Sequence, residues 1–598
     1  MKLLLRIAFT ALFVAAQTAA INANHSLQGA NKRTPATASS ITQLGNDPLD
    51  PAPAGPVSFE KFIAAHVLEM LGQAPGGEDR KAVLQLHLRA YYAGWDAAPI
   101  WVDENEATQK ARDAAKEIRT ADVFGLNPKD YAVPELNGAA TTRTDLARLE
   151  LAMTRTVLEF AHHSKAGRIA PGKAGHSLNT PQSVKNPRGF LDALRASSDV
   201  ASVLRALHPK HPQFVALKNK LAELRSGGKA GSRLQFPDGP VLRKGVAHEH
   251  VALLRKRLGV ETPGGSKSTL FDDALKAAVI SFQKNKGLKA DGVAGNGTRR
   301  ALNGGANEGQ IVRILTNMER WRWLPDDMDG DAGIYVWANI PEFRVRIVKN
   351  GKIAFAERVI VGKPGKQTPV FSDAMEWIEF HPTWYVPNSI KVEDIQPSLR
   401  RETSRVVERY HLKIDCGPLG RDWKTIDWET ADIRKCSVSQ PSGERSVMGD
   451  FKFKFPNAHA VYMHDTPLKR LFKSSIRAYS HGCVRIQNPR RMAEVLLAHD
   501  KGLKSSRISE ILNGPKRLHT EKLTRHVPVH MTYFTTIFDD GGALRILPDI
   551  YGHDRRLAQL LTGKGHLLPV PVARKHKRKK RPTQTVQDTS WGNLLTAN

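Results

Sequence analysis

The chain has 598 residues, of which 41% are hydrophobic, and its formal net charge is +30. This length is too great for one globule and predicts roughly three or four domains. A charge of this size favours an anionic partner such as nucleic acid, an anionic membrane or another polyanion. No stretch beyond the N-terminus approaches the ~20 apolar residues that cross a bilayer, which excludes a chain of many membrane spans.

Residues 1–23 have the pattern of a signal peptide. Lys2 and Arg6 precede an apolar run, and the small residues Thr18 and Ala20 suit a signal-peptidase site. This predicts export to the periplasm, with a retained N-terminal membrane anchor as the alternative. Outside the cytoplasm the anionic partner is the envelope rather than nucleic acid.

The next two segments differ in composition. Residues 24–56 are rich in Asn, Ala, Ser, Thr and Pro, which is typical of a linker. Over residues 57–236 the apolar residues follow the helical period, for example Leu84, Leu88 and Tyr91. We expect a helical domain there, with its aromatic residues in the core.

Residues 237–303 predict a small domain of three helices. Leu254 lies near the end of one helix, Leu275 lies on the apolar face of a second, and Thr298 is expected to cap a short third. The absence of cysteine and scarcity of histidine in this stretch argue against a metal site. Residues 304–332 are expected to form a connecting helix.

β signals begin near residue 333. Lys349-Asn350-Gly351 separates two alternating runs, which is typical of a hairpin. Further strands are expected at residues 451–455, 458–464 and 527–538. A β-rich domain is therefore predicted over residues 333–554, with a partly helical insert at residues 381–440.

The chemistry centres on Ser480-His481-Gly482-Cys483-Val484-Arg485. A cysteine thiol has a pKa of about 8.5, so a catalytic thiol needs a nearby base or cation. His464 lies upstream, separated from Ser480 by fifteen residues. We predict a cysteine acyl-transfer site with Cys483 as nucleophile and His464 as base. His481 is the rival base, but its position two residues before Cys483 better suits shaping the loop.

The neighbours of the thiol have expected roles too. Ser480 and Gly482 would set the loop geometry, and the amides around Gly482 and Cys483 would form an oxyanion hole. Arg485 would hold the loop or a carboxylate through its guanidinium fork. Asn488 is expected to cap the helix that follows.

The spacing from His464 to Ser480–Arg485 resembles the signature of the L,D-transpeptidases, the YkuD-type cysteine enzymes that cross-link peptidoglycan. Other stretches resemble the large YcbB-type branch of that family: residues 319–325, 340–343, 359–363, 367–369 and 462–467. Phe282-Gln283-Lys284 and Asp291-Gly292-Val293 resemble a three-helix peptidoglycan-binding domain. His381 departs from the pattern, since the family leads us to expect Asn there.

The resemblance implies a multidomain α+β fold: a helical scaffold domain, a peptidoglycan-binding domain, and a β-rich catalytic domain whose insert caps the groove. It implies that Cys483 attacks peptidoglycan tetrapeptide stems and forms 3→3 cross-links through a thioester, with no metal or organic cofactor. The alternatives are an L,D-carboxypeptidase or cross-link hydrolase that uses the same cysteine, and a non-catalytic wall-binding scaffold.

Two further expectations concern the insert and the tail. Cys416 and Cys436 both lie in the insert, so we expect them to form a disulfide that leaves Cys483 reduced; two separate thiols are the alternative. Residues 555–598 are expected to be a basic tail, either disordered or in electrostatic contact with the anionic envelope.

Overall fold

The computed structural model describes residues 57–72, 80–93, 98–138, 142–175, 178–179, 186–227, 236–261, 269–285, 288–302, 306–401 and 405–563. The expected signal peptide, the linker and the strongly basic end of the tail lie outside these residues. The chain divides into two compact units, residues 1–57 and 58–598, and everything below concerns the second. Within the described residues, no helix combines the length and apolar character needed for a membrane span.

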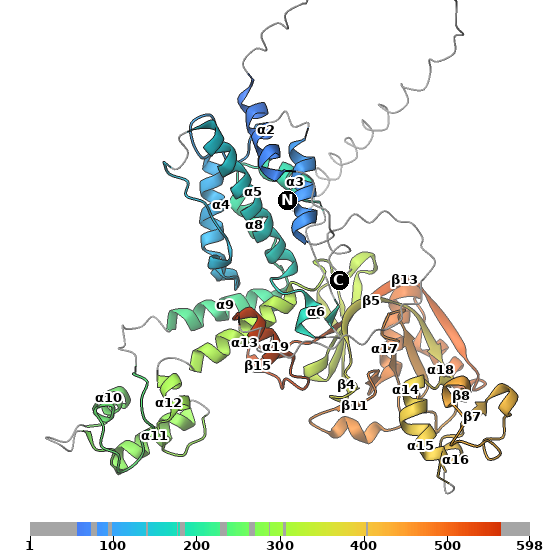
Figure 1. Cartoon of the computed structure of the whole chain (residues 1–598). Coiled ribbons are helices and arrows are strands. Elements are labelled where there is room, and N and C mark those ends of the chain that lie inside the picture. Colours follow the sequence, from blue (N-terminus) through green and yellow to red (C-terminus); the bar gives the residue numbers. More distant parts are fainter. Residues whose placement is uncertain are drawn as a thin grey trace, which may run out of the picture. The chain divides into compact units, whose positions relative to one another are not determined.

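The helical domain is confirmed. Its main helices are α2 (Phe59–Leu71), α3 (Arg80–Tyr92), α4 (Gln109–Arg119), α5 (Arg143–Ala166), α7 (Pro187–Ala196), α8 (Val200–Arg205) and α9 (Pro212–Gly227) (Figure 1). The aromatic residues are core, as expected: Tyr91, Tyr92 and Trp101 are all buried. The buried Glu150 carboxylate accepts hydrogen bonds from the Trp101 amide at 2.8 Å and the Tyr92 hydroxyl at 3.2 Å, which ties this core together.

The three-helix domain is also present, as α10 (Glu249–Leu258), α11 (Asp273–Asn285) and α12 (Asn296–Arg300), around a core of its own. The capping role predicted for Thr298 is wrong. Gly295 is the N-cap of α12, and the Thr298 hydroxyl donates to the Val293 carbonyl and accepts from Gln283, both at 3.1 Å. The hydroxyl therefore holds the preceding loop instead of the helix end.

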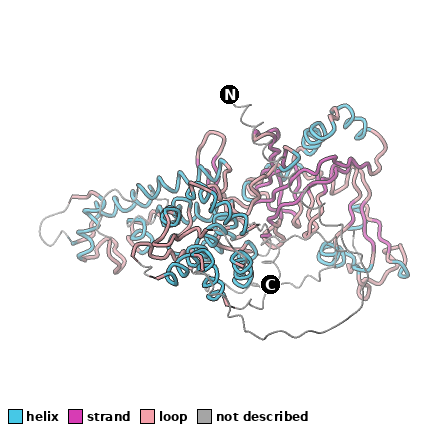
Figure 2. The backbone as a smooth tube through the Cα atoms, turned by 90° about the horizontal axis from the view of Figure 1, so that it is seen from above, coloured by secondary structure: helices cyan, strands magenta, loops and turns pink. Residues whose placement is uncertain are grey.

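The β-rich domain follows α13 (Ala306–Trp321), the expected connecting helix, which ends at Trp321 and not at residue 332 as predicted. Its principal strands are β2 (Ile334–Asn339), β3 (Arg344–Lys349), β4 (Lys352–Gly362), β5 (Val370–Phe380), β9 (Phe451–Lys454), β10 (Met463–His464), β11 (Ala478–Ser480), β12 (Val484–Ile486) and β13 (His519–Thr532). These strands lie together in one part of the molecule (Figure 2).

The main sheet has the order β5-β13-β2-β3-β4-β12-β10-β9, and a further pairing between β9 and β5 closes this path into a ring. The inward-facing residues form the largest apolar core, with α17 (Pro489–Lys501) packed on it through Met492 and Leu496. One strand was not foreseen: β1 (Leu178–Asn179), which follows the helical domain's α6 (Pro171–Ala174), pairs in parallel with β5. The helical region thus contributes backbone to the catalytic sheet.

Local turns explain why the predicted hairpin is confirmed and why one predicted strand is wrong. Asn350 and Gly351 have φ values of +48° and +72°, so the predicted hairpin is confirmed. The strand expected over residues 458–464 is wrong, since only Met463 and His464 are extended. Asn457 accepts hydrogen bonds from the amides of His459 and Val461, both at 3.1 Å, and this side-chain turn competes with strand pairing.

The insert is a partly helical body with its own apolar core. It contains β6 (Trp384–Tyr385), α14 (Asn388–Ile390), η7 (Lys391–Ile395), α15 (Gln396–Leu399), α16 (Val406–Tyr410), β7 (Lys413–Asp415) and β8 (Ser437–Gln440). The predicted disulfide between Cys416 and Cys436 is present, with the two Cα atoms 4.1 Å apart, while Cys483 is unpaired. His381, at the start of the insert, has φ +47°, a conformation that Asn adopts more readily than most residues.

Removing this disulfide is expected to weaken the insert. A loop of about 20 residues corresponds to about 3 kcal/mol in the chain-entropy model, so the Cys416→Ala, Cys436→Ala double variant should unfold at a lower temperature. Limited proteolysis would locate the loss to residues 381–440. Cys483→Ala is the control, because it removes a sulfur without opening a loop. An unchanged proteolysis rate in the double variant would contradict the prediction.

The C-terminal boundary differs from expectation. Residues up to 561 are structured, because helix α19 (His553–Leu561) buries Leu557 in the core of the β-rich domain. Asp554, at the start of this helix, forms an ion pair with Arg320 of α13. The expected tail therefore cannot begin at residue 555.

Candidate active site

The register of two short strands places the thiol. β10 and β12 are parallel neighbours in which Met463 lies opposite Val484 and His464 lies opposite Arg485. The Val484 amide donates to the Tyr462 carbonyl at 3.1 Å. Cys483 immediately precedes β12, so this register sets it beside Tyr462 and two positions from the pair of His464 and Arg485.

A chain of hydrogen bonds shapes the loop before Cys483. The Ser480 hydroxyl donates to the Cys483 carbonyl at 2.5 Å and accepts from the Gly482 amide at 3.1 Å. Thr368 donates to the Gly482 carbonyl at 2.8 Å. Gly482 has φ +119°, which a residue with a side chain rarely adopts. Ser480 and Gly482 thus lie where a loop-shaping role requires them.

The structure removes one of the expected donors of the oxyanion hole. The Gly482 amide already donates to the Ser480 hydroxyl, so in this conformation it does not point at a substrate. The Cys483 amide remains as a candidate donor.

His464 is in the protonation state that a base needs. Its side chain is buried, and burial, with the charge of Arg485 as the next cause, lowers the pKa of His464 to about 3. The imidazole is therefore neutral at neutral pH and can accept a proton.

Opposing effects act on the thiol. Burial raises the pKa of Cys483, while a hydrogen bond from the Tyr462 backbone, a second one from the Tyr462 hydroxyl, and the charges of Arg485 and Lys452 lower it. Burial has the larger effect, so the resting pair is a thiol and a neutral imidazole. The thiolate is stabilised by donors and cations that already surround it.

Tyr462 is a site residue that our sequence analysis did not single out. Its hydroxyl hydrogen-bonds to the Cys483 thiol and also to the Trp384 side chain from the insert. Its ring lies edge-on to His464, with centroids 5.6 Å apart, and Lys452 lies 4.8 Å from the ring centroid. The available signal was its position two residues before His464, since residues i and i+2 of extended chain point to the same side.

Replacing Tyr462 by phenylalanine should raise the pKa of Cys483. The hydroxyl stabilises the thiolate, so its loss should move the pH profile of iodoacetamide labelling upward by on the order of one unit. Tyr479→Phe is the matched control, because Tyr479 is an exposed tyrosine of β11. Coincident profiles for Tyr462→Phe and the parent chain would show that the hydroxyl does not act on the thiol.

The His481 side chain contacts the insert. Its Nε2 lies 3.2 Å from a carboxylate oxygen of Asp394 in η7. Beside it, Lys366 pairs with Glu393 of the same insert helix. These contacts join the insert to the loop that carries Cys483, so His481 suits a structural role better than that of the base.

Arg485 is the remaining predicted site residue. It lies on β12 opposite Ile360 of β4, and its guanidinium interacts electrostatically with Cys483 and Tyr462. This position fits stabilisation of the thiolate better than a tie across the loop. Within the described residues, no three His, Cys, Asp or Glu side chains gather closely enough to hold a metal ion.

These observations define a class of site: a free thiol and a neutral imidazole on two neighbouring segments of one sheet, the residue types that cysteine-dependent enzymes use for acyl transfer. Family models match three parts of the chain. Residues 333–504 match the L,D-transpeptidase catalytic domain, residues 87–221 match a scaffold domain, and residues 251–302 match the family described as "Putative peptidoglycan binding domain". The chain therefore contains a YkuD-type L,D-transpeptidase catalytic domain and a peptidoglycan-binding domain.

Individual relatives are similar over limited stretches. A Haemophilus influenzae protein named "Putative L,D-transpeptidase" is 30% identical over 246 residues, which cover 41% of this chain and 48% of that protein. A Bacillus licheniformis protein named "Probable N-acetylmuramoyl-L-alanine amidase" is 36% identical over 74 residues, covering 12% and 21%. The chain thus spans less than half the length of these two relatives.

Among solved structures, an L,D-transpeptidase from Mycobacterium smegmatis aligns with 33% of this chain and 58% of its own, at 11% identity and a TM-score of 0.17. A score this low does not by itself establish a shared fold.

Proposed function

We propose that the chain is a peptidoglycan L,D-transpeptidase of the large YcbB-type branch. The observation that carries this proposal is the strand register that brings His464 and Tyr462 to Cys483, inside a domain that matches the L,D-transpeptidase family.

In the proposed first half-reaction, Cys483 gives its proton to His464 and attacks the carbonyl before the terminal D-alanine of a tetrapeptide stem. The Cys483 amide donates to the oxyanion, and Arg485 and Lys452 supply positive charge nearby. The carbon–nitrogen bond breaks, His464 protonates the departing D-alanine, and a thioester remains on Cys483.

In the second half-reaction an amine of a neighbouring stem attacks the thioester. His464 takes a proton from that amine and returns it to the departing sulfur. The product is a 3→3 cross-link, and the thiol is restored. Water in place of the amine would make the enzyme an L,D-carboxypeptidase, or a hydrolase if the bond attacked is a cross-link.

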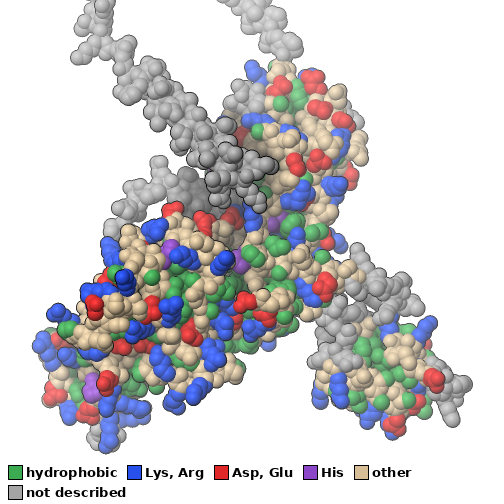
Figure 3. Space-filling view, turned by 180° about the vertical axis from the view of Figure 1, so that it is seen from behind, with side chains coloured by type: hydrophobic (Ala, Val, Ile, Leu, Met, Phe, Trp, Pro, Cys, Tyr) green, Lys and Arg blue, Asp and Glu red, His purple; other side chains and the backbone are tan. Residues whose placement is uncertain are grey.

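We further propose that the protein works in the periplasm and contacts the anionic envelope electrostatically. The support is the N-terminal signal pattern and the net charge of +30. Positive charge is not confined to the tail, because Lys and Arg side chains are spread over the face shown in Figure 3.

The test is incubation of the purified protein with tetrapeptide-rich peptidoglycan, followed by muramidase digestion and mass spectrometry of the fragments. The proposal expects 3→3 linked dimers and released D-alanine. Tripeptide monomers without dimers would identify a carboxypeptidase, and loss of pre-existing dimers a cross-link hydrolase. Unchanged fragments would point to a wall-binding scaffold.

A further inference from the structure

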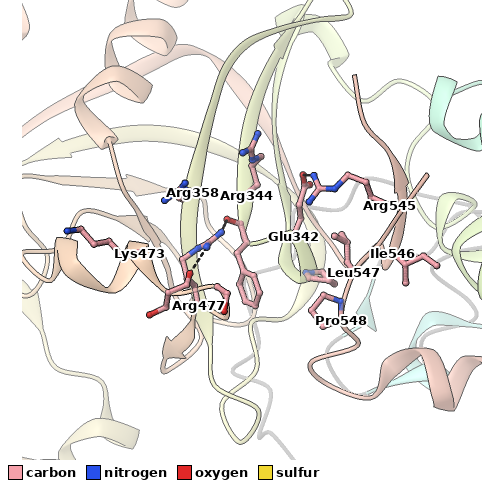
Figure 4. A pocket seen from close by; sticks show the side chains of 13 residues that line it. Glu342, Arg344, Arg358, Lys473, Arg477, Arg545, Ile546, Leu547 and Pro548 are labelled. Carbon is pink, nitrogen blue, oxygen red and sulfur yellow. Dashed lines mark hydrogen bonds and ion pairs between the residues drawn. The ribbon is translucent and has the colours of Figure 1, made fainter. Parts of the chain in front are cut away.

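A cavity outside the cysteine site carries an excess of cationic side chains. It measures about 520 Å³ and is formed by the turn before β3, by β3 and β4, by the segment before β11, and by residues 545–548. In Figure 4, Arg344 and Arg358 lie above Arg477, with Lys473 on one side and Glu342 and Arg545 on the other. The proposed transfer mechanism uses none of these residues.

The charge in this cavity is unbalanced. Five of the lining residues are Arg or Lys, and Glu342 is the one carboxylate among them. That carboxylate is already bound at both oxygens by Arg346, at 2.6 and 2.7 Å, while Arg545 lies 3.9 Å from it. Arg344, Arg358 and Lys473 are exposed, and all three line this cavity.

Arg477 also lines the cavity, and hydrogen bonds to backbone carbonyls hold its side chain in place. Its guanidinium donates to the carbonyls of Ser474, Phe343 and Val359 at 2.7, 3.1 and 3.2 Å, and it lies 5.3 Å from the centroid of the Phe343 ring. Burial, and next the charges of Arg358 and Arg344, lower the pKa of Arg477. The like charges that line this cavity repel one another, and an anion bound among them would reduce that repulsion.

We propose that this cavity binds a phosphate group. Guanidinium forks match both carboxylate and phosphate, but a single carboxylate carries one charge, whereas a phosphomonoester carries about two and offers three acceptor oxygens. Cations that line the cavity from several elements suit the ligand with more charge and more acceptors. The volume exceeds that of a bare phosphate, so the phosphate would be attached to a sugar or glycerol, either in a small molecule or in a lipid headgroup.

The cavity is separate from the thiol, yet both adjoin β4. Arg358 and Gly362 are four residues apart on this strand, a distance of about 13 Å at ~3.3 Å per residue. Gly362 borders the loop of Cys483, because it lies opposite Ser480 in the β4–β11 pairing. The phosphate site is thus an addition to the proposed function and does not depend on it.

The test measures binding to the full-length chain by calorimetry, with glycerol 3-phosphate as the small-molecule probe. Sedimentation with phosphatidic acid vesicles, whose headgroup is a phosphomonoester, against phosphatidylcholine vesicles, tests the lipid source. The Arg344→Ala, Arg358→Ala double variant removes two exposed cations and leaves Arg477 in place. Arg525→Ala is the matched control, because it removes an exposed arginine of β13 in the same domain.

We expect saturable binding of at least one of the two probes by the parent chain and by Arg525→Ala, weakened about 10-fold or more in the double variant. Binding of glycerol 3-phosphate assigns a small-molecule ligand, and binding of phosphatidic acid vesicles alone assigns a lipid headgroup. Equal binding by the double variant would overturn the site. Failure of both phosphate probes, with binding of a tetrapeptide stem that the double variant loses, would overturn it in favour of a carboxylate site. Unchanged iodoacetamide labelling of Cys483 confirms that each variant is folded.

Discussion

Replacing Cys483 by alanine is expected to abolish 3→3 cross-linking, by a factor of at least about 10³, while the protein stays folded. The substitution removes the atom that would form the thioester and changes only one small, half-buried side chain. Mass spectrometry of the muramidase digest measures the loss, and the thermal unfolding midpoint checks the fold.

The same variant tests whether the reaction is covalent. A thiolate that opens an amide-like carbonyl should also open a strained β-lactam, so the parent chain should gain the mass of one carbapenem and Cys483→Ala should gain none. The Cys416→Ala, Cys436→Ala double variant is the matched control and should still be acylated, since its cysteines pair with each other in the insert. Cross-linked dimers from Cys483→Ala, or an adduct mapped to Cys416 or Cys436, would refute the proposed nucleophile.

Replacing His464 by alanine should lower the rate of cross-linking by about 10²–10⁴-fold, the usual contribution of a positioned general base. His481→Ala is the comparison, because His481 contacts Asp394 of the insert and should affect substrate binding more than the chemical step. Single-turnover acylation by a carbapenem measures the chemical step directly. An inactive His481→Ala beside an active His464→Ala would reverse the assignment of the base.

His464 also makes a prediction about stability. Its pKa is lowered to about 3 in the folded protein, against about 6.5 in the unfolded chain, so below pH 6.5 the unfolded state binds more protons. The free energy of unfolding should therefore fall as the pH drops from 6.5 towards 3, and His464→Ala should lose part of this dependence. Denaturant unfolding at pH 7 and pH 5 measures the difference. Parallel pH dependences for the two proteins would contradict a buried, neutral His464.

Much of the site could be predicted from the sequence because its signals are local. Asn350-Gly351 adopts a turn through its own backbone preferences, and Asn488 caps α17 by accepting from the Arg491 amide three residues later. The thiol and its flanking residues are likewise close together in the chain. Such features depend on a few neighbouring residues, so a pattern of residue types identifies them.

The tertiary structure decided what depends on partners distant in sequence. The hydrogen bond from Thr368 to the Gly482 carbonyl, the pairing of β1 with β5, and the link from Trp384 through Tyr462 to Cys483 all join separate segments. The protonation states of His464 and Cys483 depend on burial and on Arg485, which no spacing records.

Local features can be predicted from sequence and long-range features cannot, for one physical reason. A turn, a cap or a short motif is stabilised by hydrogen bonds within a few residues, so its sequence is sufficient to specify it. A pKa, a strand register or a cavity lined by Arg344, Lys473 and Arg545 is the sum of contacts that exist only once the chain has closed its long loops. The sequence by itself therefore determined which residues could do the chemistry. The folded arrangement decided how the thiol is held and where the cationic cavity forms.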